Sequence, residues 1–183
     1  MLSRLFALFF LILFSPIFIL VSFAILIEDG FPVFFSQKRV GINYTFFNIY
    51  KFRSMKKHTP NVATHLLSNP DQYLLTIGKF IRKTSLDELP NLINIIKGEM
   101  VFVGPRPALF NQDDLMTLRV ATGVDKLKPG ITGWAQINGR DNISIEKKVE
   151  LEQEYLQKKS FLFDVEILIK TFTNVLFSKG VSH

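Results

Sequence analysis

The first 30 residues contain the longest apolar stretch of the chain, with no charged residue from 5 to 27. As a helix, a run of this length is enough to cross the hydrocarbon core of a bilayer, which is about 30 Å thick. The run leads into Glu28 and Asp29 without the small-residue cleavage site of a secretory signal peptide, so we expect it to be retained. The pattern therefore predicts a membrane segment at the N-terminus.

The apolar run is interrupted at Ser15-Pro16, where the proline removes a backbone hydrogen bond and kinks a helix. Basic residues flank both ends of the run, Arg4 before it and Lys38-Arg39 after it, so the positive-inside bias selects no single side. A re-entrant helix that bends at Ser15-Pro16 accounts for both features, with the Ser15 hydroxyl bonding a carbonyl that the kink frees. A kinked spanning helix fits the same pattern, so the sequence alone leaves both open.

Beyond residue 30, apolar and charged segments alternate as in a soluble domain. Strands at 33–37 and 45–52, joined by a turn-like Gly41-Ile42-Asn43, predict a short β-hairpin. Asp71 is a candidate N-cap for a helix that continues to Arg82. The further expected elements are a helix at 92–97 ended by Gly98, a strand at 100–103, and helices at 112–120, 144–154 and 164–177. The pattern predicts a helix-rich α+β fold with amphipathic helices suited to a membrane surface.

The charge balance indicates anionic partners, because the net charge is +6 and the isoelectric point is about 9.6. Nucleic acid, anionic lipid and phosphorylated small molecules all qualify, and the membrane segment favours the last two. The basic residues are scattered among acidic ones without a recognised binding motif, which argues against nucleic acid. The chain has no cysteine, which excludes a disulfide scaffold and a thiolate metal site.

The segment at 82–90 contains the densest group of candidate functional residues. Ser85 and Glu88 have the spacing of a capping box, which gives the segment a purely structural interpretation. Pro90 cannot donate a backbone hydrogen bond and disfavours a helical conformation at Leu89, so we expect an irregular turn.

A chemical interpretation of the same turn starts from its adjacent carboxylates, Asp87 and Glu88, with Arg82 and Lys83 close by in the chain. Two carboxylates beside a helix break, near basic side chains, suit a metal and phosphate site. One would bind a hard cation such as Mg²⁺ while the other attacks phosphorus. The local pattern leaves the structural and the chemical interpretation open.

Other candidate phosphate ligands are isolated basic residues. Arg106 lies in the loop at 104–107 between two prolines, which leaves little freedom to lose when its guanidinium binds a phosphate. Lys51 and Arg53 would share one face at the end of a strand, as an anion-binding edge or as a solvated charged face. Arg140 follows a turn and has the same two interpretations.

These segments occur in an order that resembles a known family, the bacterial sugar transferases, which are small monotopic phosphoglycosyl transferases. The resemblance covers nearly the whole chain, and the ordered set is specific although each motif is weak alone. The motifs are Ser15-Pro16, Tyr50-Lys51-Phe52-Arg53-Ser54-Met55, Ser85-Leu86-Asp87-Glu88-Leu89-Pro90, Lys97-Gly98-Glu99-Met100, Gly104-Pro105-Arg106-Pro107, Lys128-Pro129-Gly130-Ile131-Thr132-Gly133 and Asn138-Gly139-Arg140.

The resemblance implies two parts, a membrane-embedded re-entrant helix at 1–30, broken at Ser15-Pro16, and a catalytic domain at 31–183. Both ends of the helix would lie on the cytoplasmic side of the bacterial inner membrane. The implied reaction moves a sugar 1-phosphate from a UDP-sugar to polyprenyl (undecaprenyl) phosphate, releases UMP and gives polyprenyl-diphosphate-sugar. It would be the first membrane step of a glycoconjugate or polysaccharide pathway, such as one for O-antigen or capsule.

The resemblance also implies residue roles. Asp87 would attack the sugar-bearing phosphate and form a covalent aspartyl intermediate, and Glu88 would help Asp87 to hold Mg²⁺. The implied phosphate and substrate ligands are Lys51, Arg82, Arg106 and Arg140. Glu152 is a further expected substrate-binding residue, at a position in the surround of the active site where the family usually has aspartate.

Two rival functions remain compatible with the sequence. One is a membrane enzyme that hydrolyses or transfers another phosphate ester through Asp87. The other is a non-catalytic, membrane-anchored adaptor of a polysaccharide-assembly complex. The sequence does not identify the sugar or the length of the lipid, and it leaves the oligomeric state open, a homo-oligomer included.

Overall fold

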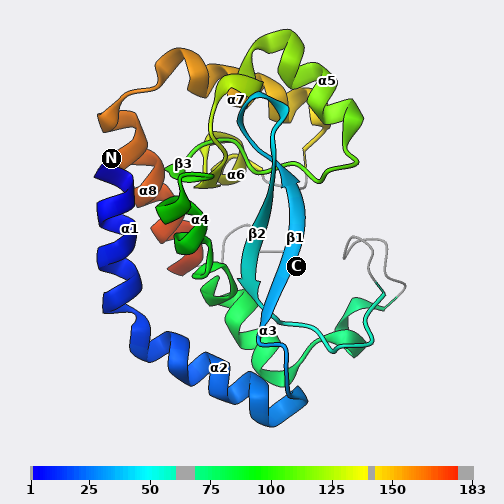
Figure 1. The fold of residues 1–183 in the computed structure, drawn as a ribbon. Helices are drawn as coiled ribbons and strands as arrows, with labels where there is room; N and C mark the ends of the chain where they lie inside the picture. The colour runs from blue at the N-terminus through cyan, green and yellow to red at the C-terminus, as the bar shows by residue number, and fades with distance from the viewer. Residues whose placement is uncertain (1, 61–68, 140–142, 177–183) are drawn as a thin grey trace.

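The computed structural model describes residues 2–60, 69–139 and 143–176, and it has the expected helix-rich α+β fold with a short hairpin (Figure 1). Its longer elements are α1 (Leu2–Leu13), α2 (Ser15–Asp29), β1 (Phe34–Val40), β2 (Phe46–Phe52), α3 (Thr76–Lys83), α4 (Asn91–Lys97), β3 (Val101–Val103), α5 (Asp113–Thr122), β4 (Gly130–Thr132), α6 (Trp134–Ile137), α7 (Ile145–Lys158) and α8 (Phe161–Leu176). Short 3₁₀ turns lie at Ile42–Tyr44, Pro70–Tyr73, Leu86–Glu88 and Val124–Lys126.

The predicted hairpin is confirmed, with β1 and β2 paired antiparallel from Phe34 opposite Phe52 to Val40 opposite Phe46. This register places Arg39, Ile49 and Lys51 on the same face of the hairpin, because side chains alternate along each strand. A second, two-stranded sheet pairs β3 with β4 in parallel. The hairpin runs lengthwise through the molecule (Figure 1).

The N-terminal helix breaks at the predicted place, and α1 and α2 meet at a bend of 60°. Pro16 has no N–H to offer the carbonyl of Ile12, and the Ser15 hydroxyl donates to that oxygen instead, at 2.7 Å. Among the described residues no single helix is long and apolar enough to cross a bilayer. The bent pair passes the same test of length and composition when its two helices are taken together.

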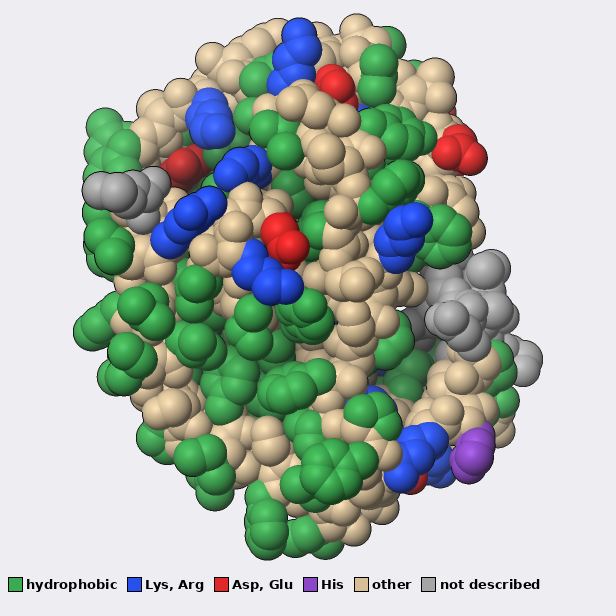
Figure 2. Space-filling model, in the orientation of Figure 1, with side chains coloured by type: hydrophobic (Ala, Val, Ile, Leu, Met, Phe, Trp, Pro, Cys, Tyr) green, Lys and Arg blue, Asp and Glu red, His purple; other side chains and the backbone are tan. Residues whose placement is uncertain are grey.

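One face of the helix pair belongs to the protein core. Ala7 of α1 is buried against Ile49 and Ile95, and Ile25 of α2 is buried in a second cluster with Phe52. The outer face is apolar and exposed, through Leu5, Phe9, Ile12, Ile19, Leu20, Phe23 and Ile27. Figure 2 shows hydrophobic side chains gathered on the side where Figure 1 places α1 and α2. The domain boundary near residue 30 stays a prediction.

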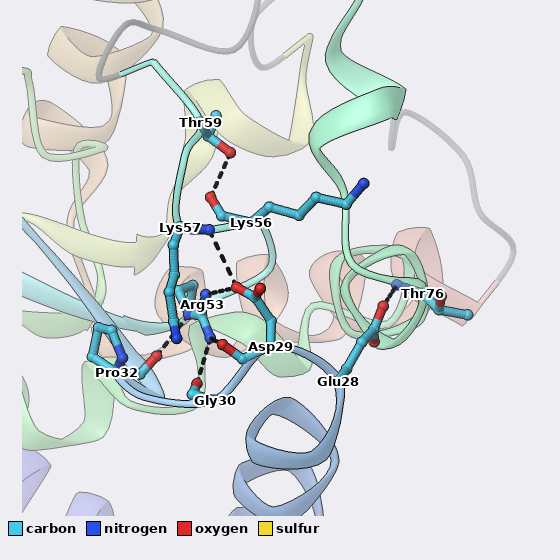
Figure 3. A network of polar contacts seen from close by, with 9 residues as sticks. All are labelled: Glu28, Asp29, Gly30, Pro32, Arg53, Lys56, Lys57, Thr59 and Thr76. Carbon is cyan, nitrogen blue, oxygen red and sulfur yellow. Dashed lines mark hydrogen bonds and ion pairs between the residues drawn. The ribbon is translucent and has the colours of Figure 1, made fainter.

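The expected start of the helix that leads to the site is wrong. Asp71 lies in a 3₁₀ turn, and α3 begins only at Thr76. The backbone N–H of Thr76 donates to the carboxylate of Glu28 at 2.5 Å (Figure 3). The N–H of Ile77 donates to the same carboxylate at 3.1 Å. Since the cap comes from the end of α2 rather than from a neighbouring residue, no local pattern marks this helix start.

The end of α4 and the start of α7 follow their local signals. Gly98 ends α4 in a left-handed conformation with φ 85°, which suits glycine. The Ser144 side chain accepts the backbone N–H of Lys147 at 3.2 Å and caps α7. The final helix, α8, starts at Phe161 rather than at Asp164, and its exposed side chains include Phe161, Leu162, Leu168, Ile169 and Phe172. It therefore presents an apolar surface, as predicted for an amphipathic helix.

Candidate active site

The turn that carries Asp87 and Glu88 is irregular, as expected, but the capping box is absent. Ser85 is left-handed, with φ 57° and ψ 17°, whereas an N-cap residue needs an extended backbone, and its side chain makes no cap hydrogen bond. Leu89 is helical, with φ −52° and ψ −38°, so the expectation that Pro90 would keep it extended is wrong. A left-handed non-glycine residue costs about 1–3 kcal/mol and is typical of functional sites.

A pocket lies beside this turn and joins three distant segments. Glu88 comes from the turn, Lys51 from β2, and Arg106 from the loop at 104–107. Lys51 Nζ lies 2.6 Å from Glu88 Oε1, and Arg106 Nη1 lies 3.9 Å from the same oxygen. The described residues that line the pocket are Arg39, Ile49, Lys51, Glu88, Asn91, Met100, Arg106, Pro107, Gly130 and Ile131.

The charge of this pocket lining is unbalanced. Among the described lining residues, Arg39, Lys51 and Arg106 are cationic, and Glu88 is the one carboxylate. The surplus of positive charge favours an anionic ligand, and guanidinium groups match the geometry of phosphate. The pocket is therefore suited to a phosphorylated molecule.

Asp87 directly precedes Glu88 and is mostly buried, with 9% of its surface exposed. It is not among the described residues that line the pocket, so its position beside the pocket comes from its place in the turn. Arg82 is half-buried near the end of α3, and its carbonyl accepts the Ser85 N–H at 3.1 Å. Arg140, the remaining candidate phosphate ligand, lies outside the described residues.

The loop that carries Arg106 is held by close backbone packing. The N–H of Gly104 donates to the carbonyl of Thr132 at 2.8 Å, and the N–H of Gly130 donates to the carbonyl of Pro105 at 2.9 Å. A Cβ on Gly104 or Gly130 would collide with the opposite backbone, so both positions need glycine for close approach. The approach of β3 and β4 thus fixes the loop from which Arg106 reaches the pocket.

Glu152 lies behind this loop, in a buried ion pair with Arg119. Its exposed fraction is 2%, and its two carboxylate oxygens accept from Arg119 Nε at 2.7 Å and Nη2 at 2.5 Å. Arg119 Nη2 also donates to the carbonyl of Arg106 at 2.9 Å. Glu152 is not among the described lining residues of the pocket, and its contact with the site runs through Arg119.

Tyr155 supports the strand that leads into the same loop. Its hydroxyl lies 3.2 Å from the carbonyl of Val103 and 2.7 Å from Asp164 Oδ1. Burial, and then the hydrogen bond to the Asp164 carboxylate, raise the pKa of Tyr155 well above its usual value. The phenol therefore stays protonated and keeps its role as a donor in the core.

Arg53 does not join Lys51 at an anion-binding edge, and that interpretation is wrong. The strand ends at Phe52, and Arg53 turns towards the end of α2. It pairs with the Asp29 carboxylate and donates to the carbonyls of Gly30 and Pro32, both at 2.6 Å (Figure 3). Its guanidinium joins the end of α2 to the segment after the hairpin.

The sequence interpretation missed three residues of the site region. Arg39 lines the pocket and donates to the carbonyl of Pro107 at 3.1 Å; strand alternation and the hairpin register together would have placed it on the same face as Lys51. Asn94 is fully buried and fixes β2, because it donates to the Asn48 carbonyl and accepts the Tyr50 N–H. Asn91 lines the pocket, and nothing in its local sequence signals this.

Comparison with known proteins gives one consistent family. The family model described as "Bacterial sugar transferase" matches residues 1–178. The uncharacterized sugar transferase EpsL of Bacillus subtilis is 44% identical over 174 residues, which cover 94% of this chain and 84% of EpsL. The exopolysaccharide production protein ExoY of Rhizobium meliloti is 36% identical over 185 residues, which cover 93% and 81% of the two chains.

A longer relative has a name that states a reaction. The UDP-glucose:undecaprenyl-phosphate glucose-1-phosphate transferase of Escherichia coli is 39% identical over 169 residues. The match covers 88% of this chain and 36% of that protein.

Proposed function

This chain belongs to the bacterial sugar transferase family and is a phosphoglycosyl transferase, and we propose that it moves a sugar 1-phosphate from a UDP-sugar to polyprenyl phosphate. UMP is released, and the lipid product is polyprenyl-diphosphate-sugar. The observation that carries this proposal is the cationic pocket beside Asp87, where Lys51 and Arg106 converge on Glu88. Both substrates bring phosphates to such a pocket.

The transfer proceeds in two displacements at the same phosphorus. A carboxylate oxygen of Asp87 attacks the sugar-bearing phosphorus, and the bond to UMP breaks with its electron pair on the leaving phosphate. An oxygen of polyprenyl phosphate then attacks this phosphorus and expels the Asp87 carboxylate. An anionic nucleophile meets strong repulsion from a pyrophosphate, which the side chains of Lys51 and Arg106 offset.

The turn also suits a Mg²⁺ ion. Asp87 and Glu88 supply two neighbouring carboxylates, and Mg²⁺ in phosphoryl-transfer enzymes is commonly held by one or two carboxylates together with substrate phosphates. Among the described residues no group of three or more His, Cys, Asp and Glu could hold a metal ion by itself, so substrate phosphates would have to complete the coordination. When bound, the cation would neutralise charge on the transferring phosphate.

The packing of the helix pair supports a re-entrant membrane segment. At its start, the Arg4 guanidinium lies directly over Gly98, at the end of α4. At its end, Glu28 caps α3 and Asp29 binds Arg53. Both ends of the helix pair therefore contact the same domain, as expected for a helix that enters and leaves through one leaflet. We place that domain on the cytoplasmic face of the bacterial inner membrane, where UDP-sugars are available.

The test is UMP release from a panel of UDP-sugars, with undecaprenyl phosphate, Mg²⁺ and detergent-held protein. Wild type should release UMP with one or a few donors, and Asp87→Asn should lower the rate at least about a thousandfold, because the amide cannot replace the nucleophile. Asp71→Asn removes the same charge from an exposed turn and should behave as wild type.

Two outcomes would count against the proposal. UMP release from Asp87→Asn at the wild-type rate would refute Asp87 as nucleophile. Folded wild-type protein that releases no UMP from any donor would refute the proposed reaction and favour the non-catalytic adaptor.

A further inference from the structure

Two buried asparagines on α4 have opposite environments. Asn94 is fully buried, and its amide is satisfied by Asn48, Glu99 and Tyr50 at 2.7–3.1 Å. Asn91, with 1% of its surface exposed, has no hydrogen-bond partner for Oδ1 within the described part of the chain. An unpaired acceptor this deeply buried is unfavourable and calls for a functional or structural reason.

The position of Asn91 supplies that reason. It lines the same pocket as Lys51, Glu88 and Arg106. It also follows Glu88 by three residues and Asp87 by four, and the chain between them is helical or nearly so. Side chains at these spacings lie on one side of a helical segment. The unpaired amide oxygen therefore belongs to the neighbourhood of the two carboxylates.

The chemistry of an acceptor narrows the choice of partner. Phosphate oxygens of the substrates are themselves acceptors, so they cannot satisfy the Asn91 oxygen. The cationic donors of the pocket have other acceptors: Lys51 and Arg106 are directed to Glu88. Arg39, the third cationic lining residue, donates to the carbonyl of Pro107 and to the side chain of Gln37. A hard cation accepts amide oxygen together with carboxylate oxygens as ligands. A cation between the turn and α4 would satisfy the oxygen that the protein leaves unpaired.

We propose that the amide oxygen of Asn91 is a third protein ligand of the Mg²⁺ site formed with Asp87 and Glu88. The inference rests on the proposed function, from which the need for a cation follows. It also gives α4 a direct part in the site, since its first residue would fix the cation while Asn94 fixes the hairpin.

The experiment measures cation binding separately from catalysis. Mn²⁺ is titrated into detergent-held protein at saturating UMP, and free Mn²⁺ is followed by electron paramagnetic resonance. Asn91→Leu should raise the Kd for Mn²⁺ about 10- to 100-fold, the range seen when a supporting group of a metal site is lost. Asn91→Asp should bind Mn²⁺ at least as tightly as wild type, because it keeps the oxygen and adds charge. Asn111→Leu, at an exposed asparagine, is the matched control and should leave the Kd unchanged.

Thermal unfolding without cation separates this role from a structural one. Asn91→Leu should keep or raise the Tm, because it removes an unpaired buried acceptor. A Kd for Asn91→Leu within twofold of wild type would overturn the proposal. So would a fall in both Tm and Mn²⁺ affinity, which would make Asn91 a packing residue, or wild-type protein that binds no Mn²⁺. The UMP-release assay uses no Asn91 variant, so failure of the proposed reaction is recognised independently.

Discussion

Arg119 and Glu152 hold the backbone of Arg106, whose side chain reaches the candidate pocket. Both side chains are buried, and their two hydrogen bonds leave Arg119 Nη2 positioned on the carbonyl of Arg106. A buried ion pair contributes little compared with apolar side chains of the same volume, but loss of one partner leaves an uncompensated buried charge. The pair is therefore sensitive to single substitutions.

We expect Glu152→Gln to lower the free energy of unfolding by about 3 kcal/mol, because Arg119 would remain buried without its counter-charge. The measurement is urea unfolding of the detergent-held protein. The matched control is Glu150→Gln, which breaks the exposed Lys147–Glu150 pair and should change stability by less than about 0.5 kcal/mol. Equal effects of the two substitutions would show that Glu152 is not in a buried pair.

Part of the site was predictable at the scale of single residues. The motifs named Lys51, Glu88 and Arg106, and the fold brings these three side chains into one pocket. Arg39 and Asn91 were missed because their roles depend on the strand register and on the packing of α4. These are properties of contacts between distant segments, which the local order of residues does not record.

At the scale of elements, α3 joins the end of α2, where Glu28 caps it, to the turn of Asp87. Its Gly78 packs directly on the backbone of Ser54, just after the hairpin, and a Cβ there would collide with the Ser54 carbonyl. The helix can lie this close to the chain only because residue 78 has no side chain. Close packing at this point sets the path of α3 towards Ser85 and Asp87.

Gly78→Ala should destabilise the protein by about 1–3 kcal/mol, the range for overpacking a filled core. In an open helix the same change would stabilise by about 1 kcal/mol, so the sign of the effect reports the contact with Ser54. Gly123→Ala is the control: its φ is 75°, and its added Cβ would have only Leu156 near, at 4.0 Å. We expect that control to cost about 1 kcal/mol, from backbone strain alone. A stabilising Gly78→Ala in urea unfolding would contradict this packing.

Elements with their own end signals were predicted well. Gly98 marks the end of α4, and Ser144 marks the start of α7. The predicted start of α3 was wrong because the cap of this helix is Glu28, at the end of another helix. The predicted role of Arg53 was wrong for the same reason, since its partners lie at the end of α2 and just after it. A local sequence pattern predicts only interactions between residues that are close in the chain, whereas these two positions are determined by tertiary contacts.

At the scale of the whole molecule, the bent helix pair forms an arc along one side of the domain (Figure 1). Its inner face supplies Ala7, Val21 and Ile25 to the core, while its outer face is apolar and exposed. If the two ends of the helix pair lay on opposite sides of a bilayer, α1 or α2 would lose its contacts with the core. The core packing and the membrane topology are therefore coupled.

Cysteine labelling tests that coupling, because the chain has no native cysteine. Ser3→Cys lies in α1 and Ser36→Cys in β1, on either side of the bend. In spheroplasts an impermeant maleimide should label neither position, and in inside-out vesicles it should label both. The cysteine-free wild type is the control for background.

Labelling from opposite sides would contradict the re-entrant arrangement. It would require α1 to leave Gly98, where Arg4 now packs, and to expose the cluster that contains Ala7. In such a protein Ala7→Asp should lower the Tm no more than Leu5→Asp does, although residue 5 faces outward. In the re-entrant arrangement Ala7→Asp is the more damaging for the folded domain, because only residue 7 is buried against it.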